Sequence, residues 1–331
     1  MTLKEMAAEL GVSISTISRV LNGCNKNFSV KPEVREKIID FAHAVGYQAN
    51  PVFKAIRTLE SRQIAVLFRK RSVIKAGYVM EQALDAVEEV LEEQNYELNY
   101  ILSAGTFDTP YRVPHWKVAG VIVPDVLAYE RLSEIEASGL PYVSLNGLCG
   151  SSGSSVISDE TANMRIVFEH LLSLGHQRIG FANSHVIKHQ HYSIYDRENA
   201  YIQLCKEFKL PEIAGYKVSS SPLEDIFDHF IQQKVTAVIA YDEYIAQRLL
   251  YLAWQRGIRI PTELSIVGFN DTEINKFLTP PLTSFSIPAG DMGRSAAQLL
   301  INKIRNPDST NNDIIKISGN LIVRESTGVK P

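Results

Sequence analysis

The segment "MAAELGVSISTISRVLNG" (Met6–Gly23) combines two patterns that usually exclude each other. Its hydroxyl residues are as dense as in a loop: Ser13, Ser15, Thr16 and Ser18. Its apolar residues nevertheless recur at the spacing of a buried helix: Val12, Ile17, Val20 and Leu21. A short helix with an apolar inner face, and an outer face of small hydroxyls that ends in Arg19 and Asn22, accounts for both patterns.

The flanking sequence predicts one helix before this segment and one after it. Residues 3–10 place apolar side chains at helical spacing, and Gly11 is the residue expected where a chain leaves a helix. Ser13 is a suitable N-cap for the second helix. A third helix begins near Pro32 and ends at Gly46. Two short helices joined by a tight turn and closed by a third form the helix-turn-helix plan.

The outer face of the second helix fits DNA. A helix that enters the major groove needs small hydroxyls beside phosphates, and a long donor for a base edge. Arg19 can form the bidentate pair with guanine O6 and N7. The alternative is a solvated helix of an ordinary three-helix bundle.

Composition favours a soluble globular protein with an uneven charge distribution. The chain has 331 residues, 45% apolar and 21% charged, with a net charge of −3. Residues 1–62 contain nine basic and six acidic residues, a balance of +3 that leaves −6 for the remainder. A basic head on an acidic body is compatible with a DNA-facing module.

The sequence also predicts a cytoplasmic location. Three scattered cysteines (Cys24, Cys149 and Cys205) suit neither a disulfide framework nor a metal site, which favours a reducing compartment. Charged residues interrupt the first ten positions, so we expect no signal peptide, and no apolar run is long enough to span a bilayer.

The rest of the chain alternates short apolar runs with amphipathic segments, which predicts a doubly wound α/β body with parallel sheets. The predicted strands are Ile64–Phe68, Leu98–Leu102, Gly120–Val123, Tyr142–Leu145, Arg178–Ala182, Ala237–Ala240, Leu264–Gly268 and Leu321–Val323. The predicted helices include Val79–Gln94, Glu160–Leu174, Arg197–Phe208, Tyr244–Arg256 and Asp291–Arg305.

The head resembles that of the lactose/galactose repressor family of bacterial transcription regulators. The resemblance rests on "TLKEMAAELGVSISTISRVLN", "VREKI" and "GYQAN". Two features depart from the family: the loop between Asn22 and Ser29 is about three residues longer than usual, and Ala49 stands where proline is common. The resemblance implies a DNA surface of Thr2, Ile14, Ser15, Thr16, Ser18, Arg19, Asn22, Asn50 and Ile56.

Residues 50–62, "NPVFKAIRTLESR", link the head to the body. In the family this segment becomes a short hinge helix on operator DNA and inserts an apolar side chain into the minor groove, which here is Ile56. The alternative is a linker whose apolar residues only touch the body. We therefore expect a DNA-binding domain over residues 1–49, a hinge over 50–62 and a ligand-binding and dimerisation domain over 63–331.

The body resembles periplasmic sugar-binding proteins, with two lobes, three crossovers and a ligand in the cleft. It carries the family landmarks "HLLSLGHQRIGF" (170–181), "RENAY" (197–201), "ELSIVGFND" (263–271) and "PPLTSFSIPAGDMGRSA" (280–296). This plan places the first lobe at about Ile64–Asn163 with a return near Ser286–Val323.

The same resemblance implies a ligand site made of Tyr78, Asn146, Arg197, Tyr241 and Asn270. Arg197, predicted to open a helix, would grip ligand hydroxyls or a carboxylate with its planar fork. Asn146 and Asn270 follow predicted strands, and their amides can both donate to and accept from sugar hydroxyls. Either tyrosine could stack on a sugar or simply belong to the core or a dimer contact.

Enzymatic interpretations have weaker support. "CGSSGSS" (149–155) lacks the signature of a phosphate loop or a nucleophile elbow, and reads as a flexible surface loop. His185, His189 and His191 lie close together, but no carboxylate–histidine pattern accompanies them, so we expect no metal site and no cofactor. A sugar-binding protein or carbohydrate-processing enzyme with an unrelated helical head is the alternative.

We therefore expect a transcriptional repressor that a small carbohydrate inducer releases from near-palindromic operator DNA. No heptad tail follows the body, which predicts a homodimer rather than a tetramer. The fold class is a small all-α helix-turn-helix domain joined by a hinge to a two-lobed, periplasmic-binding-protein-like α/β body.

Overall fold

The computed structural model describes residues 1–21, 29–47, 61–69, 77–103, 109–114, 116–126, 129–183, 191–214, 223–307 and 312–330. The chain divides into two compact units. One consists of residues 1–63 with 114–119, and the other of residues 64–113 with 120–331. Within the described ranges, no helix is both long and apolar enough to cross a bilayer.

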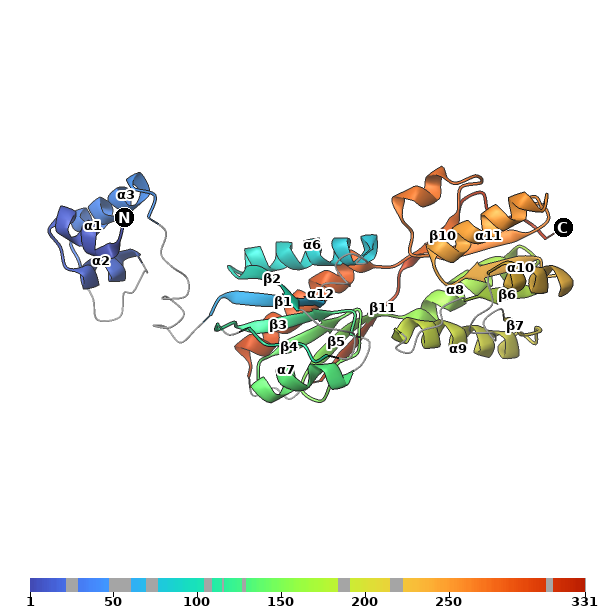
Figure 1. Cartoon of the computed structure of the whole chain (residues 1–331), viewed down its shortest axis with the longest axis horizontal. Helices are drawn as coiled ribbons and strands as arrows, with labels where there is room; N and C mark the ends of the chain where they lie inside the picture. The colour runs from blue at the N-terminus through green and yellow to red at the C-terminus, as the bar shows by residue number, and fades with distance from the viewer. Residues whose placement is uncertain are drawn as a thin grey trace. The chain divides into compact units, whose positions relative to one another are not determined.

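The head contains the three predicted helices: α1 (Leu3–Leu10), α2 (Ile14–Leu21) and α3 (Pro32–Ala44) (Figure 1). Thr2 caps α1 through a capping box, in which its hydroxyl accepts from the Glu5 amide while the Glu5 carboxylate accepts from the Thr2 amide. The buried core joins all three helices through Met6, Ala7, Ile17, Val20, Ile38 and Ala42. The periodicity of the apolar residues therefore predicted these three helices correctly.

Ser13 begins α2 as the sequence predicts, because its Oγ accepts a hydrogen bond from the Thr16 amide at 3.0 Å. Replacing Ser13 with alanine leaves that amide without its partner, so we expect α2 to lose about 1 kcal/mol of stability. Hydrogen exchange of the α2 amides in the full-length protein measures this loss. Ser29→Ala, which removes a hydroxyl outside α2, is the matched control, and equal exchange in the two variants would rule out the cap.

The first lobe of the body is built on a six-stranded sheet of order β11-β5-β4-β3-β1-β2. Its strands are β1 (Gln63–Arg69), β2 (Glu97–Ser103), β3 (Gly120–Pro124), β4 (Tyr142–Leu145), β5 (Ser154–Ser158) and β11 (Ile314–Ile317). Every residue of β3, β4 and β5 is buried, as expected for parallel strands covered on both faces. The associated helices are α6 (Tyr78–Glu93), η1 (Tyr129–Leu132), α7 (Ser133–Ser138) and α12 (Ala289–Arg305). Figure 1 labels α6, α7 and α12 beside this sheet.

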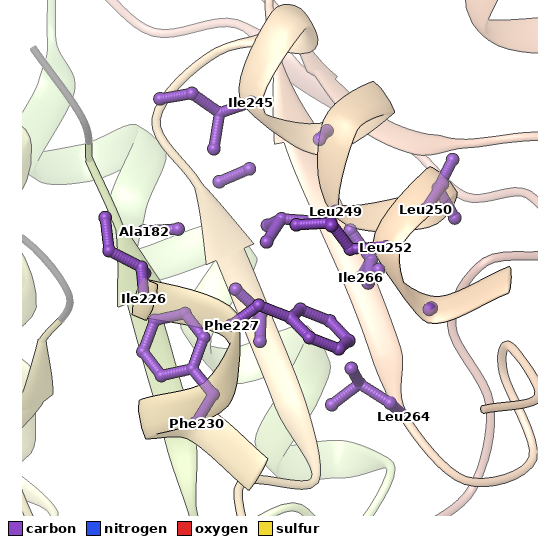
Figure 2. Close-up of a cluster of buried hydrophobic side chains, with 14 of the residues drawn as sticks. Ala182, Ile226, Phe227, Phe230, Ile245, Leu249, Leu250, Leu252, Leu264 and Ile266 are labelled. Atoms are coloured by element: carbon purple, nitrogen blue, oxygen red, sulfur yellow. The ribbon is translucent and has the colours of Figure 1, made fainter. Parts of the chain in front are cut away.

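The second lobe has a six-stranded sheet of order β12-β10-β9-β8-β6-β7. Its strands are β6 (Ile179–Ala182), β7 (Ile213–Ala214), β8 (Ala237–Ala240), β9 (Ser265–Phe269), β10 (Thr283–Ser286) and β12 (Asn320–Ile322). Its helices are α8 (Glu160–Ser173), α9 (Tyr192–Glu207), α10 (Leu223–Gln232), α11 (Glu243–Gln255) and η2 (Glu273–Phe277). Aromatic residues of α10, with Leu249 and Ile266, form a buried apolar cluster beside the sheet (Figure 2).

The chain passes between the two sheets three times, after β5, β10 and β11, which confirms the expected crossovers. The predicted extent of the first lobe is wrong in one part. The segment predicted as Leu321–Val323 belongs to the second lobe, because β12 pairs antiparallel with β10. The return through the first lobe therefore consists of α12 and β11 alone.

Two further expectations need correction. Helix α9 begins at Tyr192, so Arg197 lies in its second turn rather than at its start. The segment 149–155 is not simply a surface loop, because Ser154 and Ser155 are buried and begin β5. The preceding residues are held by the Glu136 carboxylate, which accepts from the Ser151 hydroxyl and the Ser152 amide.

Candidate functional site

The outer face of α2 presents the side chains that the sequence predicts for DNA. Ile14 is 46% exposed, and Ser15 and Arg19 are also exposed, while Ile17 and Val20 point into the core. Ser13 Oγ lies 2.7 Å from Ser15 Oγ and 2.8 Å from Thr16 Oγ1, so these hydroxyls form one polar cluster.

The structure describes some of the remaining predicted DNA-binding residues but not others. Thr16 and Ser18 are partly exposed on α2, and Thr2 lies at the N-terminus of α1, where its side chain is used in the capping box. Asn22, Asn50 and Ile56 lie outside the described residues, as does the long loop after Asn22.

The body has a polar pocket at the carboxyl ends of three strands. Asp125 follows β3, Asn146 follows β4 and Asn270 follows β9. All three have a positive backbone φ, of 49°, 56° and 63° respectively. Asn and Asp enter this left-handed region more readily than other side chains, because their short polar groups bond locally. The remaining described non-glycine residues with positive φ all follow helices: Asn95, Lys209 and Lys234.

These three residues line a pocket of about 180 Å³ to which both lobes contribute. The rest of the lining comes from residues 77–80 at the start of α6, residues 242–244 at the start of α11, and Thr272. Ligands of open α/β sheets bind outside the carboxyl ends of strands, which is where this pocket lies.

Two amide–carboxyl pairs face the pocket. Asn146 Nδ2 donates to Asp125 Oδ1 at 2.8 Å, and Asn270 Nδ2 donates to Glu243 Oε2 at 2.9 Å. Burial raises the pKa of Asp125, and nearby His191 and the bond from Asn146 offset only part of that rise. Burial likewise raises the pKa of Glu243. The pocket therefore holds hydrogen-bonding groups in a partly dehydrated setting, which suits a ligand with hydroxyls.

Asn146 also connects the two lobes. Its backbone carbonyl oxygen lies 2.6 Å from His191 Nε2, so that nitrogen must carry a proton and donate. Its side-chain oxygen accepts from the Tyr192 hydroxyl at 3.1 Å, and that hydroxyl also accepts from the Ser158 amide. A residue that lines the pocket is thus bonded directly to the start of α9 in the other lobe.

His191 is the described member of the three histidines considered for metal binding, since His185 and His189 lie outside the described residues. Its second ring nitrogen, Nδ1, lies 2.8 Å from Ser193 Oγ. Among the residues that the structure describes, no three His, Cys, Asp or Glu side chains form a group that could hold a metal ion.

Arg197 is not among the residues that line this pocket. It is buried and pairs with Glu160 through two bonds, Nε to Oε2 at 2.6 Å and Nη2 to Oε1 at 3.1 Å. Its Nη1 donates to the Tyr241 carbonyl oxygen, and its guanidinium lies over the rings of Tyr241 and Phe269, 4.8 and 4.1 Å from their centroids. Burial alone lowers the pKa of a guanidinium, but the Glu160 carboxylate reverses this, so that the pKa of Arg197 is raised.

Of the five predicted ligand residues, the pocket therefore brings together Tyr78, Asn146 and Asn270. Tyr241 does not line it, and its hydroxyl bonds to Ser193 at 2.8 Å. A direct ligand contact by Arg197 or Tyr241 stays a prediction.

Sequence reasoning missed several lining residues: Asp125, Asp242, Glu243, Tyr244 and Thr272. The signal for Asp125 was available, because it follows a predicted strand just as Asn146 does. The acids at 242 and 243 follow β8 in the same way and begin α11, where Asp242 accepts from the Ile245 amide.

A small helix-turn-helix head and a two-lobed body with a polar cleft together define a ligand-binding transcriptional regulator. Comparisons with known proteins agree. Residues 2–50 match the model of the bacterial regulatory proteins of the lacI family, and residues 168–327 match a periplasmic binding protein-like domain. The chain therefore combines a helix-turn-helix domain of the lacI family with a periplasmic binding protein-like domain, as the sequence resemblance implied, and its homologues are DNA-binding transcriptional regulators.

Similar proteins match along nearly the whole length. The transcriptional regulator GanR of Bacillus subtilis is 28% identical, over 98% of this chain and 99% of that protein. The fold is similar to that of the Lac repressor dimer bound to operator and the anti-inducer ONPF, with a TM-score of 0.78, 20% identity and coverage of 99% of each chain. A complex of the regulator CelR with cellobiose has a TM-score of 0.65 and 22% identity, covering 98% of this chain and 99% of that one.

Proposed function

We propose that this protein represses genes of sugar utilisation and that a small carbohydrate, bound in the pocket between the lobes, releases it from operator DNA. The observation that supports this most is the pairing of Asn146 with Asp125 and of Asn270 with Glu243 at the carboxyl ends of strands. Amide and carboxyl groups held in this way offer both donors and acceptors to the hydroxyls of a sugar.

On the DNA side, the proposal assigns base reading to the outer face of α2. Arg19 reads a guanine, Ile14 and Ser15 contact neighbouring bases, and the surrounding hydroxyls contact phosphates. Residues 51–59 form the hinge helix on operator, with Ile56 in the minor groove. Hydrogen exchange of this segment in free and operator-bound protein tests the hinge, since equal protection in both states contradicts it.

The proposed active form is a homodimer that binds two half-sites of a near-palindromic operator. Exposed apolar side chains on the second lobe support an interface there. Tyr251 and Trp254 on α11 are 43% and 74% exposed with their ring centroids 5.8 Å apart, and Phe277 on η2 is 75% exposed. Exposed aromatic residues that lie side by side, as Tyr251 and Trp254 do, are typical of surfaces that bind another protein.

Asn146 provides a route from ligand to DNA in this proposal. It lines the pocket and bonds to His191 and Tyr192 at the start of α9, so a ligand that engages its amide changes the contacts between the lobes. Effector and operator must then weaken each other's binding by the same factor.

Operator release tests the proposal. DNA sites are first selected from a random library by the full-length protein, and binding to the selected site is followed by fluorescence anisotropy during titration with a panel of sugars. We expect at least one sugar to lower operator affinity tenfold or more. Failure to select any DNA site, or a selected site that no sugar releases, contradicts the proposal.

We further propose that the protein acts in the cytoplasm, where operator DNA is found, and that it binds its effector without transforming it. The relatives in the comparisons are regulators of transcription. Prolonged incubation with the releasing sugar should return it unchanged when the mixture is separated by chromatography, and a cleaved product would contradict this part of the proposal.

A further inference from the structure

A second polar pocket lies next to the first. Its volume is about 140 Å³, and it shares Tyr78 and Thr272 with the pocket described above. Both lobes contribute to it, with Gln82 on α6 from the first lobe, and Asp271, Ser286 and Arg324 from the second. Because the two pockets share two wall residues, a single elongated ligand can contact both.

The charged groups of the second pocket are paired with one another. Arg324 Nη1 and Nη2 donate to the two Asp271 carboxylate oxygens at 2.7 and 2.9 Å, and Nη1 also donates to the Leu282 carbonyl oxygen. Lys276 forms an ion pair with Glu273. Because each of these charges already has a partner of opposite sign, the second pocket suits a neutral polar group better than an ion.

The shared wall contains a group whose hydrogen bonding is incomplete. Thr272 Oγ1 is buried and has no hydrogen-bond partner among the described residues, although buried hydroxyls are normally bonded. Rotation of the Thr272 side chain about χ1 would turn its hydroxyl toward a ligand at the junction of the two pockets, and a ligand hydroxyl there would supply the missing bond. Tyr78, the first residue of α6, adds an aromatic ring to both pockets, and the C–H face of a sugar packs well on such a surface.

We propose that the effector is a neutral sugar of two rings, with one ring in each pocket and the linkage beside Tyr78 and Thr272. This inference rests on the proposed function, since it specifies the ligand of the same cleft. A single ring fills one pocket and leaves the polar groups of the other to water. A second ring adds contacts to Gln82, Ser286 and the Arg324–Asp271 pair without the entropic cost of a second independent binding event.

Isothermal titration calorimetry on the full-length protein tests the inference with matched probes: galactose with β-1,4-galactobiose, and glucose with cellobiose and maltose. We expect at least one disaccharide to bind tenfold or more tightly than its own monosaccharide. Equal affinities within every pair, or no binding by any of the three disaccharides, would overturn the inference.

A surface substitution then locates the second ring. Gln82 is exposed on α6, so Gln82→Ala removes a pocket contact with little effect on folding. We expect this variant to reduce the ratio of disaccharide to monosaccharide affinity at least fivefold. Glu81→Ala, which changes the adjacent exposed residue outside both pockets, should leave the ratio unchanged. An unchanged ratio in Gln82→Ala would overturn the assignment.

The two proposals can fail separately. If a monosaccharide releases operator and disaccharides do not bind more tightly, the proposed function stands and the two-ring ligand is wrong. If a disaccharide binds tightly but no sugar changes operator affinity, the ligand class stands and the proposed regulation is wrong.

Discussion

Replacing Glu160 with alanine is expected to lower the free energy of unfolding of the body by about 3–5 kcal/mol. The reason is that Arg197 then stays buried without its carboxylate partner. The side chains of Arg197 and Glu160 are only 4% and 2% exposed, so water cannot replace the lost bonds. Urea denaturation of the full-length protein, followed by circular dichroism, measures the change.

Two further variants make this prediction specific. Glu207→Ala breaks the exposed pair between Arg165 and Glu207, and we expect a much smaller loss, because water screens that pair. The double variant Glu160→Ala/Arg197→Met removes both charges, and we expect it to recover much of the stability lost in Glu160→Ala. A loss in Glu160→Ala no greater than that in Glu207→Ala would show that the buried pair is unimportant.

The double variant also tests the role of Arg197. The family resemblance implies that Arg197 holds the ligand, whereas its contacts with Glu160, Tyr241 and Phe269 favour a role in positioning α9 against β8 and β9. If the stable double variant still binds the releasing sugar with unchanged affinity, a direct ligand contact by Arg197 is wrong. A tenfold or greater loss of sugar affinity with intact operator binding would support that contact.

Arg19→Ala is expected to weaken binding to the selected operator by about 1–3 kcal/mol and to remove the preference for guanine at one position of each half-site. Arg19 is exposed on the outer face of α2, and the head core does not include it, so the change should leave the fold intact. The measurement is anisotropy with the selected operator and with operators altered at single positions.

Lys31→Ala is the matched control for Arg19→Ala, because it removes an exposed cation from the same head at the residue before α3. We expect it to weaken all sequences to a similar degree and to reduce the salt dependence of binding, as loss of a phosphate contact does. If Arg19→Ala also weakens all sequences equally, base reading by Arg19 is wrong.

The sequence by itself was sufficient to predict the head. Its three helices, the Ser13 cap and the inward position of Ile17 and Val20 follow from spacing within one or two turns, and the structure has them all. The same holds for the strands Tyr142–Leu145 and Ala237–Ala240, whose apolar runs are bounded by turn or helix signals. In these segments burial follows a local pattern, so local sequence contains the information.

Strand β5 shows where a local pattern is insufficient. Its first two residues belong to the segment 149–155 that we interpreted as a surface loop, yet all five residues of Ser154–Ser158 are buried between β4 and β11. Ser158 Oγ accepts from Asn163 Nδ2, which lies close to it in the sequence. Ser154 Oγ instead accepts from the amide of Asp313, a residue far along the chain, and this bond helps to accommodate the hydroxyl inside. Only the folded chain brings Ser154 and Asp313 together.

The pocket residues, too, were predicted only in part from the sequence. That Asn146 and Asn270 stand at the ends of strands, and hence at a binding edge, could be read from the sequence. The hydrogen-bond partners of the polar residues could not be read from the sequence. Asn146 pairs with Asp125, Asn270 pairs with Glu243, and Arg197 pairs with Glu160. Sequence periodicity determines which face of an element is buried, whereas the pairing of polar groups 21 to 37 residues apart depends on strand order and lobe packing, which only the tertiary structure decides.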